Sequence, residues 1–141
     1  MDFEFFSAKP VSIVLPARLS FEYVQARQDL IFVYSNDMHN RGMEGMAFFF
    51  VGNPNAFMVP TIKKTCKSAT DKYFRDGQKW ILALIDKHIN AIPRDGRPII
   101  PVRGIGCGCS MLREYAPQTF KYLWSKLDEI SAKNIEWETT I

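Results

Sequence analysis

The residues whose types and spacing most clearly suit ligand binding form a glycine-rich segment, Gly104 to Gly108, directly after an apolar run. Glycine has no Cβ, so successive backbone N–H groups can surround an anion. The pattern favours a loop that holds phosphate or pyrophosphate, and a tight turn that binds nothing is the alternative. The residues of this loop are Gly104, Ile105, Gly106, Cys107 and Gly108. Their spacing is neither that of a Walker loop nor that of the dinucleotide fingerprint.

A second, polar segment runs from Ser35 to Gly45. Amide and carboxylate side chains at the end of a strand can bind ribose hydroxyls or a base edge, and an arginine can pair with phosphate. The alternative is an ordinary loop that caps the following helix. The candidate ligand-binding residues of this segment are Asn36, Asp37, His39, Arg41, Gly42 and Gly45.

The cysteines and histidines do not suggest a metal or a catalytic thiol. Cys107 and Cys109 are too close for an ordinary disulfide, and neither C-x₂-C spacing nor ligand spacing of the two histidines is present. No histidine is positioned by sequence to activate a cysteine, so small buried thiols explain both residues better. We expect no metal and no cofactor, and binding is favoured over catalysis.

Charge and hydropathy narrow the class of protein further. The 141 residues have a formal net charge of 18 − 15 = +3, and residues 61–80 alone contribute 6 − 2 = +4. A binder of nucleic acid usually shows a larger overall excess, so the basic stretch is interpreted as a phosphate-neutralising or solvated patch. The apolar runs are too short to span a membrane, and Met1 to Phe6 lacks the features of a secretory signal. The sequence therefore predicts a cytoplasmic protein without membrane or nucleic-acid partners.

The elements that must position these residues alternate between strands and helices. Glycine and proline punctuation divides the predicted strands Val11–Leu15, Asp29–Tyr34, Phe57–Pro60 and Arg97–Arg103 from the predicted helices Gln78–Asn90 and Tyr115–Ile130. Residues 1–27 read as a loosely patterned lead-in, Met46–Phe50 as a helix start or a strand, and residues 131–141 as a tail or a short strand. The alternation predicts an α/β fold with a mostly parallel sheet. In such sheets ligands bind beyond the carboxyl ends of the strands, where both polar segments would lie.

Several strings also resemble a largely uncharacterised family from bacteria and bacteriophages that is similar to macro domains. The strings cover roughly residues 28–124 and are Asp29–Asp37, Arg41–Ala47, Val59–Ile62, Pro101–Cys109 and Tyr115–Phe120. In that family a strand ends in a Gly/Asn turn, and another ends in Ile-Gly-Cys-Gly before a helix opened by Ala-Pro. The resemblance implies a macro-like, mostly parallel mixed sheet flanked by helices, in a single domain over residues 1–141 with a core at about 28–130.

The same resemblance implies the function. It predicts a protein that binds an ADP-ribose-like or cyclic nucleotide ligand, as a phage anti-defence protein that sequesters a nucleotide signal of the host's immunity in the host cytoplasm. The glycine loop would hold phosphate, and Asn36, Asp37 and Arg41 would hold ribose or base. The implied ligand-binding set also includes Thr61 of the Pro-Thr segment, with Arg103 or the stretch Lys63–Lys67 neutralising charge.

Other readings stay open. Asn36 or Asp37 could position water in an ADP-ribosyl hydrolase of macro-domain type, or an aromatic surface could inhibit a host protein directly. Where the family has small Gly-Ala-Ala residues, this chain has Gly45, Met46 and Ala47, which places a bulky side chain on the path of a ligand. A homo-oligomer is compatible with the sequence, which does not decide it.

Overall fold

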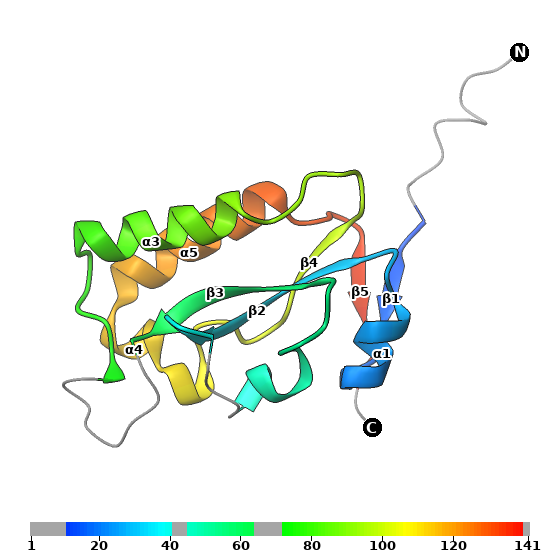
Figure 1. The fold of residues 1–141 in the computed structure, drawn as a ribbon, viewed down its shortest axis with the longest axis horizontal. Coiled ribbons are helices and arrows are strands. Elements are labelled where there is room, and N and C mark those ends of the chain that lie inside the picture. Colours follow the sequence, from blue (N-terminus) through cyan, green and yellow to red (C-terminus); the bar gives the residue numbers. More distant parts are fainter. Residues whose placement is uncertain (1–10, 41–44, 64–71, 140–141) are drawn as a thin grey trace, which may run out of the picture.

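The computed structural model describes residues 11–40, 45–63 and 72–139 and shows parallel strands packed between helices (Figure 1). In the central sheet, β2 (Ile31–Asp37) lies between β3 (Ala56–Ile62) and β4 (Ile99–Pro101). A second parallel sheet pairs β1 (Ile13–Leu15) with β5 (Ile135–Trp137). The amide of Ala132 donates to the carbonyl of Ile99 at 2.9 Å. This bond places the approach to β5 along the outer edge of β4, so the two sheets lie side by side.

The strand β2 is the centre of the core because both of its faces are buried. Ile31 and Val33 belong to one apolar cluster, whereas Phe32 and Tyr34 belong to the other. Successive side chains of a strand point to opposite faces, so a nearly continuous apolar run is what a doubly covered parallel strand requires.

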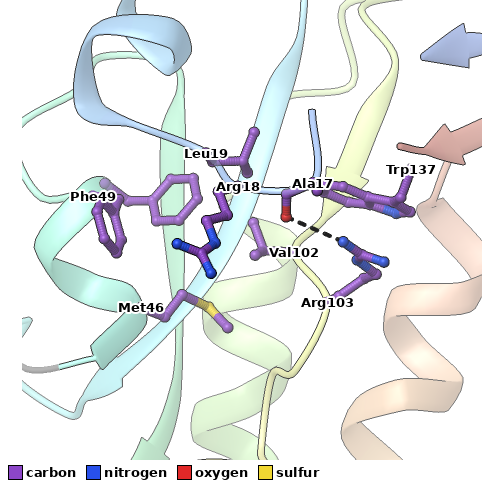
Figure 2. Close-up of a pocket in the computed structure, with 9 residues that line it drawn as sticks. Ala17, Arg18, Leu19, Met46, Phe49, Val102, Arg103 and Trp137 are labelled. Atoms are coloured by element: carbon purple, nitrogen blue, oxygen red, sulfur yellow. Dashed lines mark hydrogen bonds between the residues drawn. The ribbon is translucent and has the colours of Figure 1, made fainter. Parts of the chain in front are cut away.

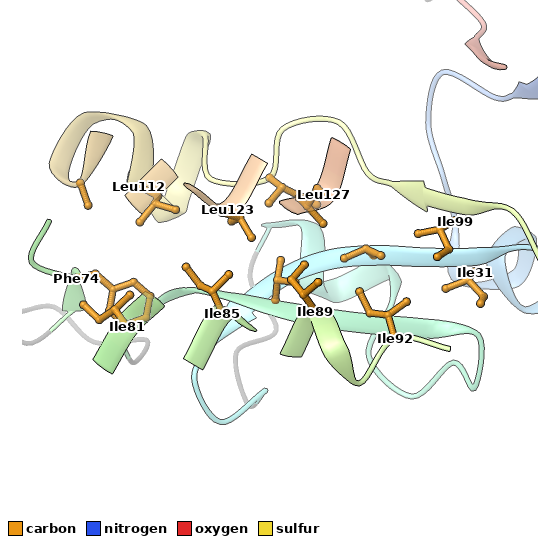
Figure 3. Close-up of a cluster of buried hydrophobic side chains, with 14 residues drawn as sticks. Ile31, Phe74, Ile81, Ile85, Ile89, Ile92, Ile99, Leu112, Leu123 and Leu127 are labelled. Carbon is orange, nitrogen blue, oxygen red and sulfur yellow. The ribbon is translucent and has the colours of Figure 1, made fainter. Parts of the chain in front are cut away.

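The first face of the sheet is covered by α3 (Lys79–Asn90) and α5 (Pro117–Ile130), which lie next to each other (Figures 1 and 3). One stripe of α3, at the spacing of a helical face, is buried in this cluster and consists of Ile81, Ile85 and Ile89. Leu123 and Leu127 of α5 belong to the same cluster.

The opposite face is covered by α1 (Phe21–Ala26) and the 3₁₀ helix η2 (Gly45–Phe49). Phe50, just after η2, stacks on Tyr34 with ring centroids 5.3 Å apart. The buried Asn55 fastens this layer to β3, because its Nδ2 donates to the carbonyls of Val24 and Arg27 at 2.8 Å. Helices on both faces give three layers, α/β/α.

Pro101 fits inside β4 because of its place in the hydrogen-bond pattern. Ile31 donates to the carbonyl of Pro98 and Val102 donates to that of Val33, so alternate residues of β4 face β2. Pro101 falls between these positions, and the N–H that proline lacks would point away from β2.

The α/β class with parallel sheets flanked by helices is confirmed, but several boundaries differ from the predicted ones. All the observed strand pairs are parallel, so the described sheets are not mixed. The strand β2 continues to Asp37 because Asn36 and Asp37 pair with residues of β3.

Outside the central sheet, the predicted lead-in, residues 1–27, contains α1, which Ser20 caps by accepting a hydrogen bond from the amide of Tyr23. The predicted helix Tyr115–Ile130 is two helices, α4 (Leu112–Tyr115) and α5, separated at Ala116. Met46–Phe50 is mostly the helix η2, and the tail contains β5.

The amino end of α5 is capped from a distant part of the chain. The carboxylate of Asp76 accepts hydrogen bonds from the amides of Gln118 and Thr119, at 3.2 and 2.9 Å, and from the Thr119 hydroxyl. Burial alone would raise the pKa of Asp76, but these hydrogen bonds outweigh it and lower that pKa. The cap therefore works through the ionised carboxylate.

We expect Asp76→Ala to lower the free energy of unfolding by about 1 kcal/mol near neutral pH, as loss of an N-cap does. Because the folded-state pKa is lowered from its ordinary value of 3.8, the contribution is complete above that value and is lost as the pH falls below it. Urea unfolding of the native protein and the variant across this pH range measures the difference. Asp128→Ala, which removes an exposed carboxylate of α5 outside the cap, should change stability little; equal losses would contradict the capping role.

Candidate functional site

The carboxyl ends of β2, β3 and β4 share one edge of the central sheet, because all three strands are parallel. The polar segment that follows β2 and the glycine loop that follows β4 therefore both lie at this edge. Arg41 and Gly42, together with Lys64 to Lys67 of the basic stretch, fall outside the described residues.

At the end of β2, polar side chains hydrogen-bond to one another and to backbone amides of the same turn. Asn36 donates from Nδ2 to Oδ1 of Asn40 at 2.8 Å, and its own Oδ1 accepts from the amide of Asp37. Asp37 accepts from the amide of His39 at 3.0 Å, and the Tyr34 hydroxyl also donates to Asn40. Burial raises the pKa of Tyr34, which keeps this hydroxyl protonated. Asn36 and Asp37 are both buried, so their best-supported role is to shape this turn.

Thr61 and Gly45 occupy special backbone positions nearby. The register between β2 and β3 shifts where Asn36 pairs with Pro60 and Asp37 pairs with Ile62, so the buried Thr61 is the extra residue of a bulge. Gly45 begins η2 with φ of 57°, a left-handed conformation that glycine adopts without strain. Neither residue lines the pocket described below.

The glycine loop after β4 is held by hydrogen bonds to its carbonyl groups. The amide of Cys107 donates to Gly104, that of Arg113 donates to Gly106, and the indole of Trp124 donates to Ile105 at 3.0 Å. Within the described residues, no hydrogen bond engages the amide of Gly106 or Gly108. Cys107 is a free, partly exposed thiol.

Gly106 has a packing role that the sequence did not reveal. A Cβ at this position would lie 2.7 Å from Cδ2 of Phe120, so only glycine lets this ring of α5 lie against the loop. Gly106 is buried, whereas Gly104 and Gly108 are exposed. Helix packing therefore explains one of the three alternating glycines, and the other two remain available to a ligand.

A pocket of about 330 Å³ opens beside the end of β4, on the face of the sheet that α1 and η2 cover (Figure 2). Four parts of the chain line it: the loop after β1, the segment Met46–Phe50 that begins in η2, the residues after β4, and β5. The loop between β1 and α1 contributes Ala17, Arg18 and Leu19. The other lining residues are Met46, Phe49, Phe50, Val102, Arg103 and Trp137.

Among the described residues, the pocket is lined by two guanidinium groups and no acidic side chain. Arg103 is held in place, since its guanidinium lies 4.5 Å from the centroid of the Trp137 ring and donates to the carbonyl of Ala17 at 3.3 Å. The exposed Arg18 makes no hydrogen bond or ion pair with any described residue. The local potential therefore favours an anionic ligand.

Of the predicted site residues that the structure describes, only Arg103 lines this pocket. Gly104 follows Arg103 directly but does not line the pocket, and neither do Asn36, Asp37 and His39 at the end of β2. Sequence reasoning missed Arg18, Phe49 and Trp137. The signal that could have found Arg18 is its place directly after the strand Val11–Leu15, because loops at carboxyl ends of parallel strands gather at one edge.

The described residues contain no group of three or more His, Cys, Asp or Glu side chains that could hold a metal ion. No helix among them is long and apolar enough to cross a membrane.

We expect Gly106→Ala to lower the free energy of unfolding by roughly 1–3 kcal/mol more than Gly96→Ala, because the new methyl group would overlap Phe120. Gly96 is the matched control, since its φ of +97° resembles the +84° of Gly106 while nothing lies within 4 Å of its Cβ position. Chemical unfolding of both variants gives the comparison. Equal losses would show that Phe120 moves aside without cost.

Comparison with known proteins gives a family but no described function. No curated protein and no solved structure matches the chain. One family model, described as a family of unknown function (DUF7831), matches residues 14–126. This span contains the glycine loop, the polar segment after β2 and every lining residue of the pocket except Trp137. The chain therefore belongs to this family of unknown function, DUF7831.

Proposed function

We propose that this protein binds a nucleotide-derived anion, of ADP-ribose or cyclic nucleotide type, in the pocket between Arg18 and Arg103. The observation that carries the proposal is the lining itself, because its described residues include two arginines and several aromatic rings but no carboxylate. Phosphate groups suit guanidinium donors, which can form paired, charge-assisted hydrogen bonds.

The two arginines support this proposal in different ways, because Arg103 is held by a contact with Trp137 and Arg18 is not. Stacking on Trp137 holds Arg103 ready, so little side-chain entropy would be lost when it binds an anion. Arg18 is exposed and has no hydrogen-bond or ion-pair partner in the part of the chain that the structure describes, and in Figure 2 it reaches from the other side of the pocket, between Phe49 and Met46. An anion between the two would satisfy both guanidinium groups.

The aromatic and apolar lining supports a planar group beside the anion. Phe49 is 39% exposed at the pocket, and apolar side chains of Leu19 and Val102 complete the lining. A nucleobase is planar and stacks on such rings. The exposed Gly104 follows Arg103 directly, so a phosphate between the arginines would also lie near the start of the glycine loop.

Binding is better supported than hydrolysis. The described residues that line the pocket include no carboxylate, imidazole or thiol, and hydrogen bonds tie Asn36 and Asp37 to their own turn. Sequestration of a nucleotide signal, the role that the resemblance to the phage family implies, requires binding alone.

We expect ADP-ribose or a cyclic nucleotide to bind in titration calorimetry, and Arg18→Ala and Arg103→Ala each to weaken binding by about tenfold or more, because each removes a hydrogen bond to a charged group. Arg97→Ala is the matched control. It removes the same charge at the opposite end of β4, where Arg97 pairs with Asp95 at 2.7 Å. If all three variants bound equally, the pocket would not be the site. No heat with any nucleotide would contradict the proposed function.

A nucleotide retained through purification would identify the ligand directly. The protein is denatured, and the mass of any small molecule released is measured by mass spectrometry. We expect a phosphate-bearing nucleotide from the native protein and less of it from Arg103→Ala. A released molecule without phosphate would contradict the anion assignment.

A further inference from the structure

Met46 separates the pocket from the two polar segments at the sheet edge. It belongs to η2 and lines the pocket, where Figure 2 shows its side chain extended below Arg18. Its Sδ lies 3.4 Å from the amide nitrogen of Ser35 in β2 and 3.6 Å from the Ser35 hydroxyl, both of which donate to it. Its Cε lies 3.9 Å from the Cβ position of Gly104. The side chain therefore spans from β2 to the first residue of the glycine loop.

The pocket on the near side of Met46 is small. Its volume of about 330 Å³ is close to the lower end of the range of about 300–1,000 Å³ for small-molecule sites. One base, one ribose and one phosphate form a compact ligand that suits such a volume. A ligand with a second phosphate and a second sugar exceeds such a volume, and one that extended toward the glycine loop would meet the Met46 side chain beside Gly104.

Packing and hydrogen bonds fix the position of the Met46 side chain. It packs against both apolar clusters, one on each face of the sheet, and its sulfur accepts hydrogen bonds from Ser35. Met is a flexible side chain that fills irregular gaps, so Met46 could move aside for a larger ligand only by losing its contacts with Ser35 and beside Gly104.

We propose that Met46 limits the length of the ligand, so that the native chain selects nucleotides with a single nucleoside, such as a mononucleotide or a cyclic mononucleotide, over ADP-ribose-length molecules. Met46 is then a specificity-determining residue of the pocket. This inference rests on the proposed function, because it concerns which nucleotides the same pocket admits.

The test compares short and long ligands that share a base, in two pairs: AMP with ADP-ribose, and UMP with UDP-glucose. Titration calorimetry gives the ratio of long-ligand to short-ligand affinity for the native protein and for Met46→Leu, Met46→Val and Met46→Ala. We expect the ratio to stay unchanged in Met46→Leu and to rise progressively in Met46→Val and Met46→Ala, by about tenfold or more in the last.

Met58→Ala is the matched control. Met58 in β3 packs against the cluster on the same face of the sheet but does not line the pocket, so this variant loosens the core without opening the path past Gly104. Circular dichroism establishes that each variant is folded, and Met46→Val provides the comparison if Met46→Ala does not fold.

The outcomes distinguish the two proposals. A ratio that rises in Met46→Ala but not in Met46→Leu or Met58→Ala supports the length limit. A native protein that binds long ligands as tightly as short ones, or a ratio that does not respond to Met46, overturns the length limit while nucleotide binding stands. Failure of these four nucleotides and of the cyclic nucleotides to bind the native protein and the variants overturns the proposed function and the length limit together.

Discussion

Burial of β2 on both faces, between two parallel neighbours, is the constraint on which the rest of the structure depends. Each large apolar side chain that it removes from water contributes about 1.5–3 kcal/mol, and none of the four from Ile31 to Tyr34 is more than 2% exposed. A strand buried in this way needs helices on both sides, which α3 with α5 and α1 with η2 provide. Parallel pairing then brings the carboxyl ends of β3, β2 and β4 to one edge, so the packing of the core also places the loops.

The glycine loop shows how folding and binding requirements meet at this edge. Gly106 is required by the close approach of Phe120, a packing contact between the loop and α5. Gly104 and Gly108 have positive φ values in exposed positions, where no side chain would be obstructed. One glycine thus serves the core while its neighbours remain at the surface. The same pattern of residues therefore has two physical causes, and spacing alone does not separate them.

The polar segment at the end of β2 has a structural role where its residue types suggest a chemical one. Asn36 and Asp37 are residues whose types suggest contact with a ribose or a water molecule, yet they extend the strand and fasten its turn through Asn40 and His39. The pocket instead takes its two arginines from the segments after β1 and after β4, beside the second sheet, in which Leu15 of β1 pairs with Trp137 of β5. Arg18 and Arg103 can remain unpaired with carboxylates there because both are exposed, so neither pays the full cost of a buried charge.

The sequence by itself determined the α/β class, the approximate strands and helices, and the carboxyl edge of the sheet as the place of interest. Those features follow from local patterns: an apolar run flanked by glycine or proline, and a helical stripe such as Ile81, Ile85 and Ile89 in α3. The end of β2 is set by the pairing of Asn36 and Asp37 with residues of β3, and a local sequence pattern does not show this pairing. Only the tertiary structure brought Arg18, Arg103 and Trp137 together, because their meeting depends on the pairing of β1 with β5, strands from opposite ends of the chain. It also decided that Met46 lies between this pocket and the glycine loop, since that position is set by packing against both faces of the sheet.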